Sequence, residues 1–162
     1  MLDVICDTSP IQYLYQLELL DIIPKLANQV FVPSAVIEEI KIGHSLGVNL
    51  PKLEELDWVT IRRPISELAL PLVANLGPGE TEVLMLALEM REAVAVLDDG
   101  PAREMAETLD LLLTGTLGLL LDAKKAGLVP ALRPLLDKLQ SLRFRLASRT
   151  YSAVLRLADE SN

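Results

Sequence analysis

The sequence predicts an α/β fold, a three-layer α/β/α sandwich with a central parallel sheet of about five strands. Two observations support this prediction. Short apolar runs alternate with helical patterns along the chain, and the runs are apolar throughout rather than alternating, as in strands buried on both faces. Right-handed crossovers between such strands place helices on both sides of the sheet. We expect a single domain of 162 residues, with a core over 1–130 and a C-terminal helical extension over 131–162.

Five apolar runs are the expected strands. They are rich in Val, Ile and Leu, and most are followed directly by polar or turn-forming residues. The runs occupy residues 4–6, 30–32, 58–61, 93–97 and 111–113.

The expected helices carry apolar residues at helical spacing and are bounded by Pro, Gly or capping residues. Thr8 or Ser9 can cap the first helix, which Pro10 opens and Pro24 closes, and Ser34 can cap the second. The predicted helices cover residues 10–23, 35–42, 66–74, 80–91, 102–108, 117–126, 130–142 and 148–157, with a polar loop over 44–55.

Charge restricts the classes of function. The net charge of −8 argues against a general nucleic-acid binder, because phosphate contacts require Lys and Arg. Residues 1–121 carry 19 acids and 7 bases, whereas residues 122–156 carry 2 acids and 8 bases. An acidic body beside a basic rim suits a metal-dependent enzyme that acts on a polyanion, although solvated helix faces would give the same count.

The sequence also predicts where the protein resides. No apolar run approaches the roughly 20 residues of a membrane span. The N-terminus lacks the layout of a signal peptide, and the single cysteine, Cys6, cannot form an intrachain disulfide. We therefore expect a cytoplasmic protein with no membrane partner.

Carboxylates fall near the ends of the predicted strands. Asp7 follows the first strand, and Asp98 and Asp99 follow the fourth. Glu39 lies in the helix after the second strand, and Glu80 begins the helix before the fourth. These segments can converge at the edge where open α/β sheets bind ligands.

Carboxylates that share a crevice repel one another unless a cation neutralises them. A set of oxygen ligands suits Mg²⁺ or Mn²⁺ rather than Zn²⁺. One or two such ions, about 4 Å apart, can activate water for in-line attack on a phosphodiester. The sequence contains no P-loop, no Gly-x-Gly-x-x-Gly after a strand and only one histidine, so it offers no rival catalytic motif.

Each acid also has a purely structural interpretation. Glu80 can stabilise a helix dipole from the first turn. Glu38 and Glu39 can form a solvated helix face, and Asp98 and Asp99 can serve the turn before Gly-Pro. The hypothesis of a metal site therefore depends on the occurrence of these acids together at strand ends.

A glycine-containing segment over residues 114–118, Thr-Gly-Thr-Leu-Gly, has two interpretations. Its backbone N–H groups can bind phosphate at the start of the following helix, which suggests a phosphate-binding α/β protein with its site near Gly115. Alternatively, the glycines serve a tight turn and close packing.

Four motifs in this order and spacing resemble the PIN domain family, over roughly residues 2–130. The similarity is greatest to an uncharacterised prokaryotic branch, in which a later segment resembles residues 114–127. The motifs are VICDTS at 4–9, VPSAVIEEI at 32–40, GETEVLMLA at 79–87 and VLDD at 96–99.

The resemblance implies a Mg²⁺- or Mn²⁺-dependent ribonuclease, often the toxin of a toxin–antitoxin pair and often a homodimer. RNA, an antitoxin protein and a second copy of the chain are therefore the expected partners. By motif, Asp7 is a metal ligand and Glu39 is the second carboxylate of the family. Glu80 is the third, where the wider family usually has Asp, and Asp98 or Asp99 is the fourth.

The sequence leaves the roles of several residues, and one alternative function, undecided. Thr8, Ser9 and Thr114 are expected to support the acids. Glu38 and Glu82 lie beside the assigned acids and are alternative ligands. The alternative function is a PIN-fold scaffold that no longer cuts and instead binds a protein or a nucleic acid.

Overall fold

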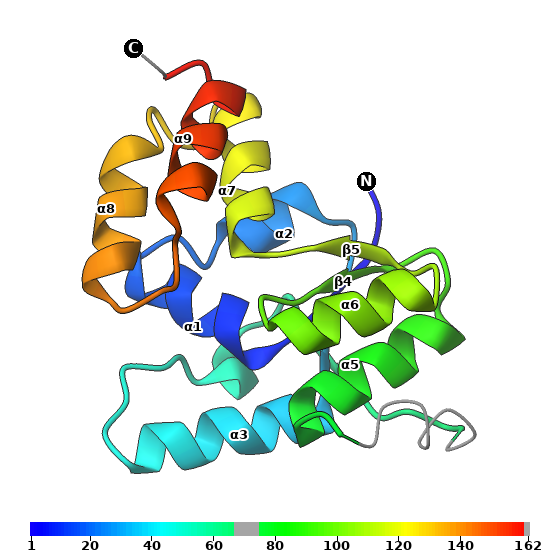
Figure 1. The fold of residues 1–162 in the computed structure, drawn as a ribbon. Helices are drawn as coiled ribbons and strands as arrows, with labels where there is room; N and C mark the ends of the chain where they lie inside the picture. The colour runs from blue at the N-terminus through cyan, green and yellow to red at the C-terminus, as the bar shows by residue number, and fades with distance from the viewer. Residues whose placement is uncertain (67–74, 161–162) are drawn as a thin grey trace.

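A five-stranded, all-parallel sheet forms the centre of the computed structural model, which describes residues 1–66 and 75–160 (Figure 1). The strand order is β3-β2-β1-β4-β5, so the chain winds outward from β1 in both directions. The predicted fold class is confirmed. The helix predicted over residues 66–74 falls almost wholly outside the described residues. The strands are β1 (Val4–Cys6), β2 (Val30–Pro33), β3 (Val59–Arg62), β4 (Val94–Val96) and β5 (Leu112–Thr114).

Helices cover both faces of this sheet. In Figure 1, α5 and α6 lie below the sheet and α2 and α7 lie above it. α5 packs against β1, β2 and β4, whereas α7 packs against α1 and α2 and carries α9 on its outer side. The helices are α1 (Thr8–Gln16), α2 (Ile22–Leu26), α3 (Ser34–Ser45), the 3₁₀ turn η1 (Leu53–Glu55), α5 (Pro78–Glu89), α6 (Gly100–Thr108), α7 (Thr116–Lys125), α8 (Arg133–Ser141) and α9 (Ser148–Leu157).

The central strands are short and contribute mainly to the core. All three residues of β1 are buried, which explains its uninterrupted apolar sequence. Val4 pairs with Val30 of β2 on one side and with Val94 of β4 on the other. The carboxyl ends of β1 and β4 therefore lie side by side, and the Asp7 N–H donates to the Val96 carbonyl at 3.1 Å.

The first predicted helix, over residues 10–23, is wrong in its extent, because the segment forms two helices. α1 ends at Gln16 with Leu17 as its C-cap, and Glu18 turns the chain with a φ of +61°. The Leu19 N–H then donates back to the Leu14 carbonyl at 2.8 Å, which closes the helix end. Pro24 does not close the segment but lies in the first turn of α2, where its missing N–H costs no hydrogen bond.

The predicted helix caps are also wrong. α1 begins at Thr8, so its N-cap position is Asp7 rather than Thr8 or Ser9. α3 begins at Ser34, and Pro33 occupies the N-cap position of this helix. The hydroxyl groups of Thr8, Ser9 and Ser34 instead donate to carboxylates on other segments.

Glu160 joins the last helices to the body of the domain. Its carboxylate accepts from Lys124 Nζ at 2.9 Å, from the Leu132 N–H at 2.7 Å and from the Arg133 N–H at 3.1 Å. Burial alone would raise the pKa of Glu160, but these hydrogen bonds hold it below its ordinary value. One carboxylate thus fixes the end of α9 against α7 and the start of α8. Within the described ranges, no helix is both long and apolar enough to cross a membrane.

Candidate metal centre

Asp7 lies at the carboxyl end of β1 and is almost fully buried, with 4% of its surface exposed. Burial raises the pKa of its carboxyl group to about 7, and repulsion from Glu80, Glu39 and Asp98 adds to the shift, although a hydrogen bond from the Thr8 backbone opposes it. None of the ion pairs found in the described parts of the chain involves Asp7. Among the described residues this buried acid therefore lies beside other acids and has no ion-pair partner.

Glu39 is held directly beside Asp7. The Thr8 hydroxyl donates to Glu39 Oε1 at 2.6 Å, and the Gly79 N–H donates to Oε2 at 3.2 Å. A Cβ atom at Gly79 would overlap Glu39 Oε1 and lie 3.0 Å from Asp7 Oδ1. Glycine before Glu80 therefore allows the start of α5 to approach both carboxylates closely.

Asp98 is fixed by donors from two other segments. The Thr116 hydroxyl donates to Asp98 Oδ2 at 2.6 Å and the Thr116 N–H to Oδ1 at 2.8 Å, while the Ser9 hydroxyl donates to Oδ2 at 3.1 Å. Asp99 is more exposed and caps α6 by accepting from the Ala102 N–H at 3.0 Å. Asp98 is thus oriented by the first turns of α1 and α7, whereas Asp99 also serves as the N-cap of α6.

The structure separates the neighbouring glutamates that the sequence left open. Glu80 accepts from the Gly77 N–H at 2.8 Å; burial raises the pKa of Glu80, and repulsion from Asp99 and Glu39 adds to the shift. Glu82 turns away and accepts from the Ser34 hydroxyl and the Ala35 N–H, at 2.9 and 2.8 Å, at the start of α3.

Glu38 is exposed on α3, whereas Glu39 is partly buried. The geometry therefore favours Glu80 over Glu82, and Glu39 over Glu38, as members of the site.

These acids meet at a cleft of about 300 Å³. Glu39 is not among the residues that line it, although Glu39 and Asp7 both lie next to Gly79. The lining residues are Asp7, Ser9, Tyr13, Glu80, Asp98, Asp99, Arg143, Phe144 and Arg145.

Thr114, which was expected to support the acids, lines a neighbouring cleft of about 370 Å³ instead. Its side chain faces Gly118, where a Cβ atom would overlap the Thr114 hydroxyl. Thr8 and Ser9, by contrast, both contact a carboxylate of the set.

The fit of a divalent ion depends on donor chemistry and spacing. Among residues 1–66 and 75–160, no three Asp, Glu, His or Cys side chains are gathered tightly enough to enclose an ion. Mg²⁺ keeps several waters and is usually held through only one or two carboxylates, so it does not require a closed cage. The oxygen-only donors around the acidic cleft fit such a partly hydrated ion, which Asp7, Glu80, Asp98 and Asp99 would hold.

Sequence reasoning missed several residues of this region. Thr116 is fully buried and gives Asp98 two hydrogen bonds. Its position just beyond β5, beside the end of β4, is the signal that could have identified it. Tyr13, Phe144 and Arg145 reach the cleft through long-range packing that no local pattern encodes, although the basic C-terminal third did indicate a basic rim.

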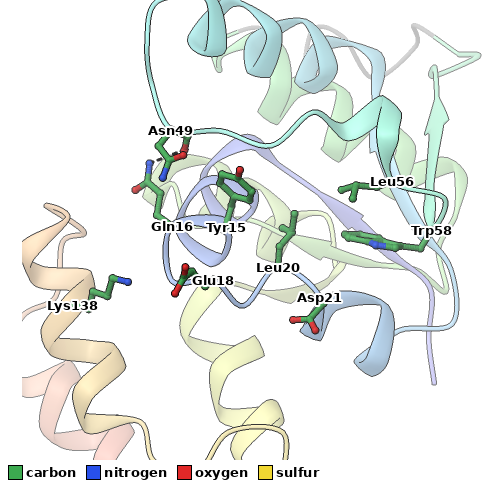
Figure 2. Close-up of a pocket in the computed structure, with 9 residues that line it drawn as sticks. All are labelled: Tyr15, Gln16, Glu18, Leu20, Asp21, Asn49, Leu56, Trp58 and Lys138. Atoms are coloured by element: carbon green, nitrogen blue, oxygen red, sulfur yellow. Dashed lines mark hydrogen bonds between the residues drawn. The ribbon is translucent and has the colours of Figure 1, made fainter.

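A larger cavity, of about 640 Å³, lies at the other end of α1 (Figure 2). Its lining includes Trp58 and the acids Glu18 and Asp21, and Asp21 is paired with Lys25 at 3.2 Å. This cavity shares no lining residue with the acidic cleft. The acidic cleft, although smaller, is the candidate site because the strand ends direct carboxylates to it.

The parallel sheet, with acids gathered beyond the ends of β1 and β4, defines a nuclease-type α/β fold. The chain belongs to the PIN domain family, whose model matches residues 3–160. PIN domains are generally nucleases and typically use divalent metals. A search of curated proteins gave no match.

Proposed function

We propose that this PIN domain is a Mg²⁺- or Mn²⁺-dependent endoribonuclease that cleaves RNA phosphodiesters. The observation that carries the proposal is Asp7, a buried carboxylate surrounded by Glu39, Glu80 and Asp98. Burying a charge is costly unless it is paired. A divalent ion in the cleft would offset both the cost of burying the Asp7 charge and the repulsion between the acids. PIN domains typically use divalent metals.

The side chains around the cleft would have different roles. The bound ion would supply Lewis-acid activation of water and of a phosphoryl oxygen. Asp7, Glu80, Asp98 and Asp99 would hold it, and Glu39 keeps the local charge negative. The Thr8 hydroxyl orients Glu39, and Ser9 and Thr116 orient Asp98. Asp98 accepts three hydrogen bonds from Ser9 and Thr116 and so retains one lone pair for a ligand.

Calorimetric titration with Mn²⁺ tests this proposal. The wild-type protein should bind Mn²⁺ and cut a fluorescent oligoribonucleotide, and Asp7→Asn should lose both activities with an unchanged circular dichroism spectrum. Asp122→Asn, which alters an exposed acid on α7, is the matched control and should behave like the wild type. The proposal fails if the wild type binds no divalent ion or if Asp7→Asn cleaves at full rate.

One observation favours a second candidate function, a PIN-fold scaffold that binds without cutting. In the described part of the chain the acids are not already gathered around a metal position. A scaffold would bind RNA or a protein equally well with and without Mn²⁺, and it would release no cleavage product.

Assembly forms a further part of the proposal. Ile42 and Leu46, at the end of α3, are 58% and 77% exposed and lie one helical turn apart. We propose that they contribute to a homodimer, and that the protein acts in the cytoplasm under control of a cognate antitoxin. Light scattering of Leu46→Gln tests the dimer, which should dissociate, and co-expression with a neighbouring open reading frame tests the antitoxin.

A further inference from the structure

The connection between α8 and α9 brings positive charge to the rim of the acidic cleft. Arg143 and Arg145 line the cleft together with Asp7 and Glu80. Both arginines are exposed, and across the described ranges neither guanidinium group has a hydrogen bond or an ion pair. They are therefore available to a ligand, on a protein whose net charge of −8 otherwise repels anions.

Backbone hydrogen bonds fix the start of the loop between α8 and α9, residues 142–147. The Phe144 N–H donates to the Leu139 carbonyl and the Arg143 N–H to the Gln140 carbonyl, both at 3.0 Å. These bonds close the end of α8 around Arg143, which has a φ of +70°, a conformation that glycine adopts more readily. Glycine at this position would keep the backbone and remove only the side chain.

An aromatic contact joins the same loop to α1. The rings of Phe144 and Tyr13 meet edge to face, with centroids 5.0 Å apart and planes at 89°. Tyr13 belongs to α1, which begins immediately after Asp7. The loop is thus fixed relative to the acids, and an aromatic side chain stands between its two arginines.

The loop also separates two adjoining clefts. Asp98, Phe144 and Arg145 line both the acidic cleft and the neighbouring cleft of about 370 Å³. Arg103 lines the second cleft and donates to the Leu97 carbonyl at 2.8 Å. The second cleft is less acidic, since it has Asp98 as an acidic lining residue and Arg103 and Arg145 as basic ones.

We propose that Arg143 and Arg145 clamp the backbone phosphates of single-stranded RNA beside the acidic cleft, while Phe144 stacks on an unpaired base. This inference rests on the proposed function, since it concerns the substrate of the same site. Guanidinium groups bind phosphate through paired hydrogen bonds. Stacking on a protein side chain requires a base that is free of a duplex, so the clamp selects single strands.

Fluorescence anisotropy in the Asp7→Asn background, which prevents cleavage, tests the clamp. The probes are a labelled single-stranded oligoribonucleotide and the same strand in a duplex. Arg143→Gly combined with Arg145→Gln should weaken binding of the single strand by about tenfold or more. The slope of log K against log salt should fall by about 0.7 for each lost phosphate contact. Lys125→Gln combined with Arg156→Gln removes the same charge at the far ends of α7 and α9, and should change neither quantity.

A second readout separates failure of the clamp from failure of the nuclease. A chromogenic nitrophenyl phosphodiester reports hydrolysis at the metal centre without an RNA strand, and the wild type and the variant with Lys125→Gln and Arg156→Gln should hydrolyse it at the same rate. Unchanged RNA affinity in the loop variants would overturn the clamp, as would the absence of RNA binding or a preference for duplex. Arginine-dependent RNA binding without hydrolysis of either substrate would support the clamp and overturn the nuclease.

Discussion

Replacing Asp7 by asparagine should stabilise the metal-free protein, although it removes a proposed metal ligand. The pKa of Asp7 is about 7 in the folded protein, against an ordinary value of 3.8. The fold therefore favours the protonated acid. The contribution of Asp7 to stability is fully present below pH 3.8 and is lost as the pH rises towards about 7.

The size of this effect follows from the two pKa values. Their difference, at about 1.4 kcal/mol for each pH unit, corresponds to about 4 kcal/mol above pH 7. Asp7→Asn escapes this loss, so at about pH 8 it should be more stable than the wild type by about 4 kcal/mol, or roughly 8–16 °C in melting temperature. At about pH 5 the difference should fall to less than half.

The fluorescence of Trp58, the single tryptophan, can follow thermal unfolding in the presence of a chelator. In a second melt without the chelator, free Mn²⁺ at a hundredfold excess over its dissociation constant should stabilise the wild type by about 2.7 kcal/mol and should leave Asp7→Asn unaffected. Equal melting temperatures of the two proteins at both pH values would refute the argument that Asp7 is buried as an unpaired acid.

Three further substitutions test how the site is built. Gly79→Ala places a methyl group against the neighbouring carboxylates; it should cost about 1–3 kcal/mol in urea denaturation and weaken Mn²⁺ binding, and unchanged stability would contradict the close approach. Thr116→Val should cost about 1–2 kcal/mol and lower kcat by releasing Asp98, and an unchanged kcat would show that Asp98 needs no such support. Glu80→Gln should weaken Mn²⁺ binding in calorimetry, whereas Glu82→Gln should only cost about 1 kcal/mol at the start of α3, and the reverse result would exchange their roles.

The sheet and its acidic edge could be predicted because they follow from local composition. A buried parallel strand must be apolar along its whole length, so the run at β1 was visible without any partner. The carboxyl ends of such strands meet at one edge, which brought Asp7 and Asp98 together in the prediction. The structure places both at the same cleft.

The parts that could not be predicted depend on contacts between distant segments. Thr8 and Ser34 have the sequence signature of helix caps, yet each donates to a glutamate more than thirty residues away. The break after Leu17 uses a left-handed Glu18, where a sequence pattern would expect glycine. Packing across the domain, and not local preference, decided these positions.

The carboxylate of Glu160 has a consequence for how this protein can vary. It fixes the last three helices, and through them the loop at the rim, but it touches none of the acids at the strand ends. The loop that carries the proposed RNA clamp is therefore secured by contacts other than those that position Asp7 and Glu39, whereas Asp98 also depends on Thr116 at the start of α7. If the acids at the strand ends form the proposed nuclease site, relatives with the same acids could acquire new substrates by changes in the loop between α8 and α9 that Glu160 secures.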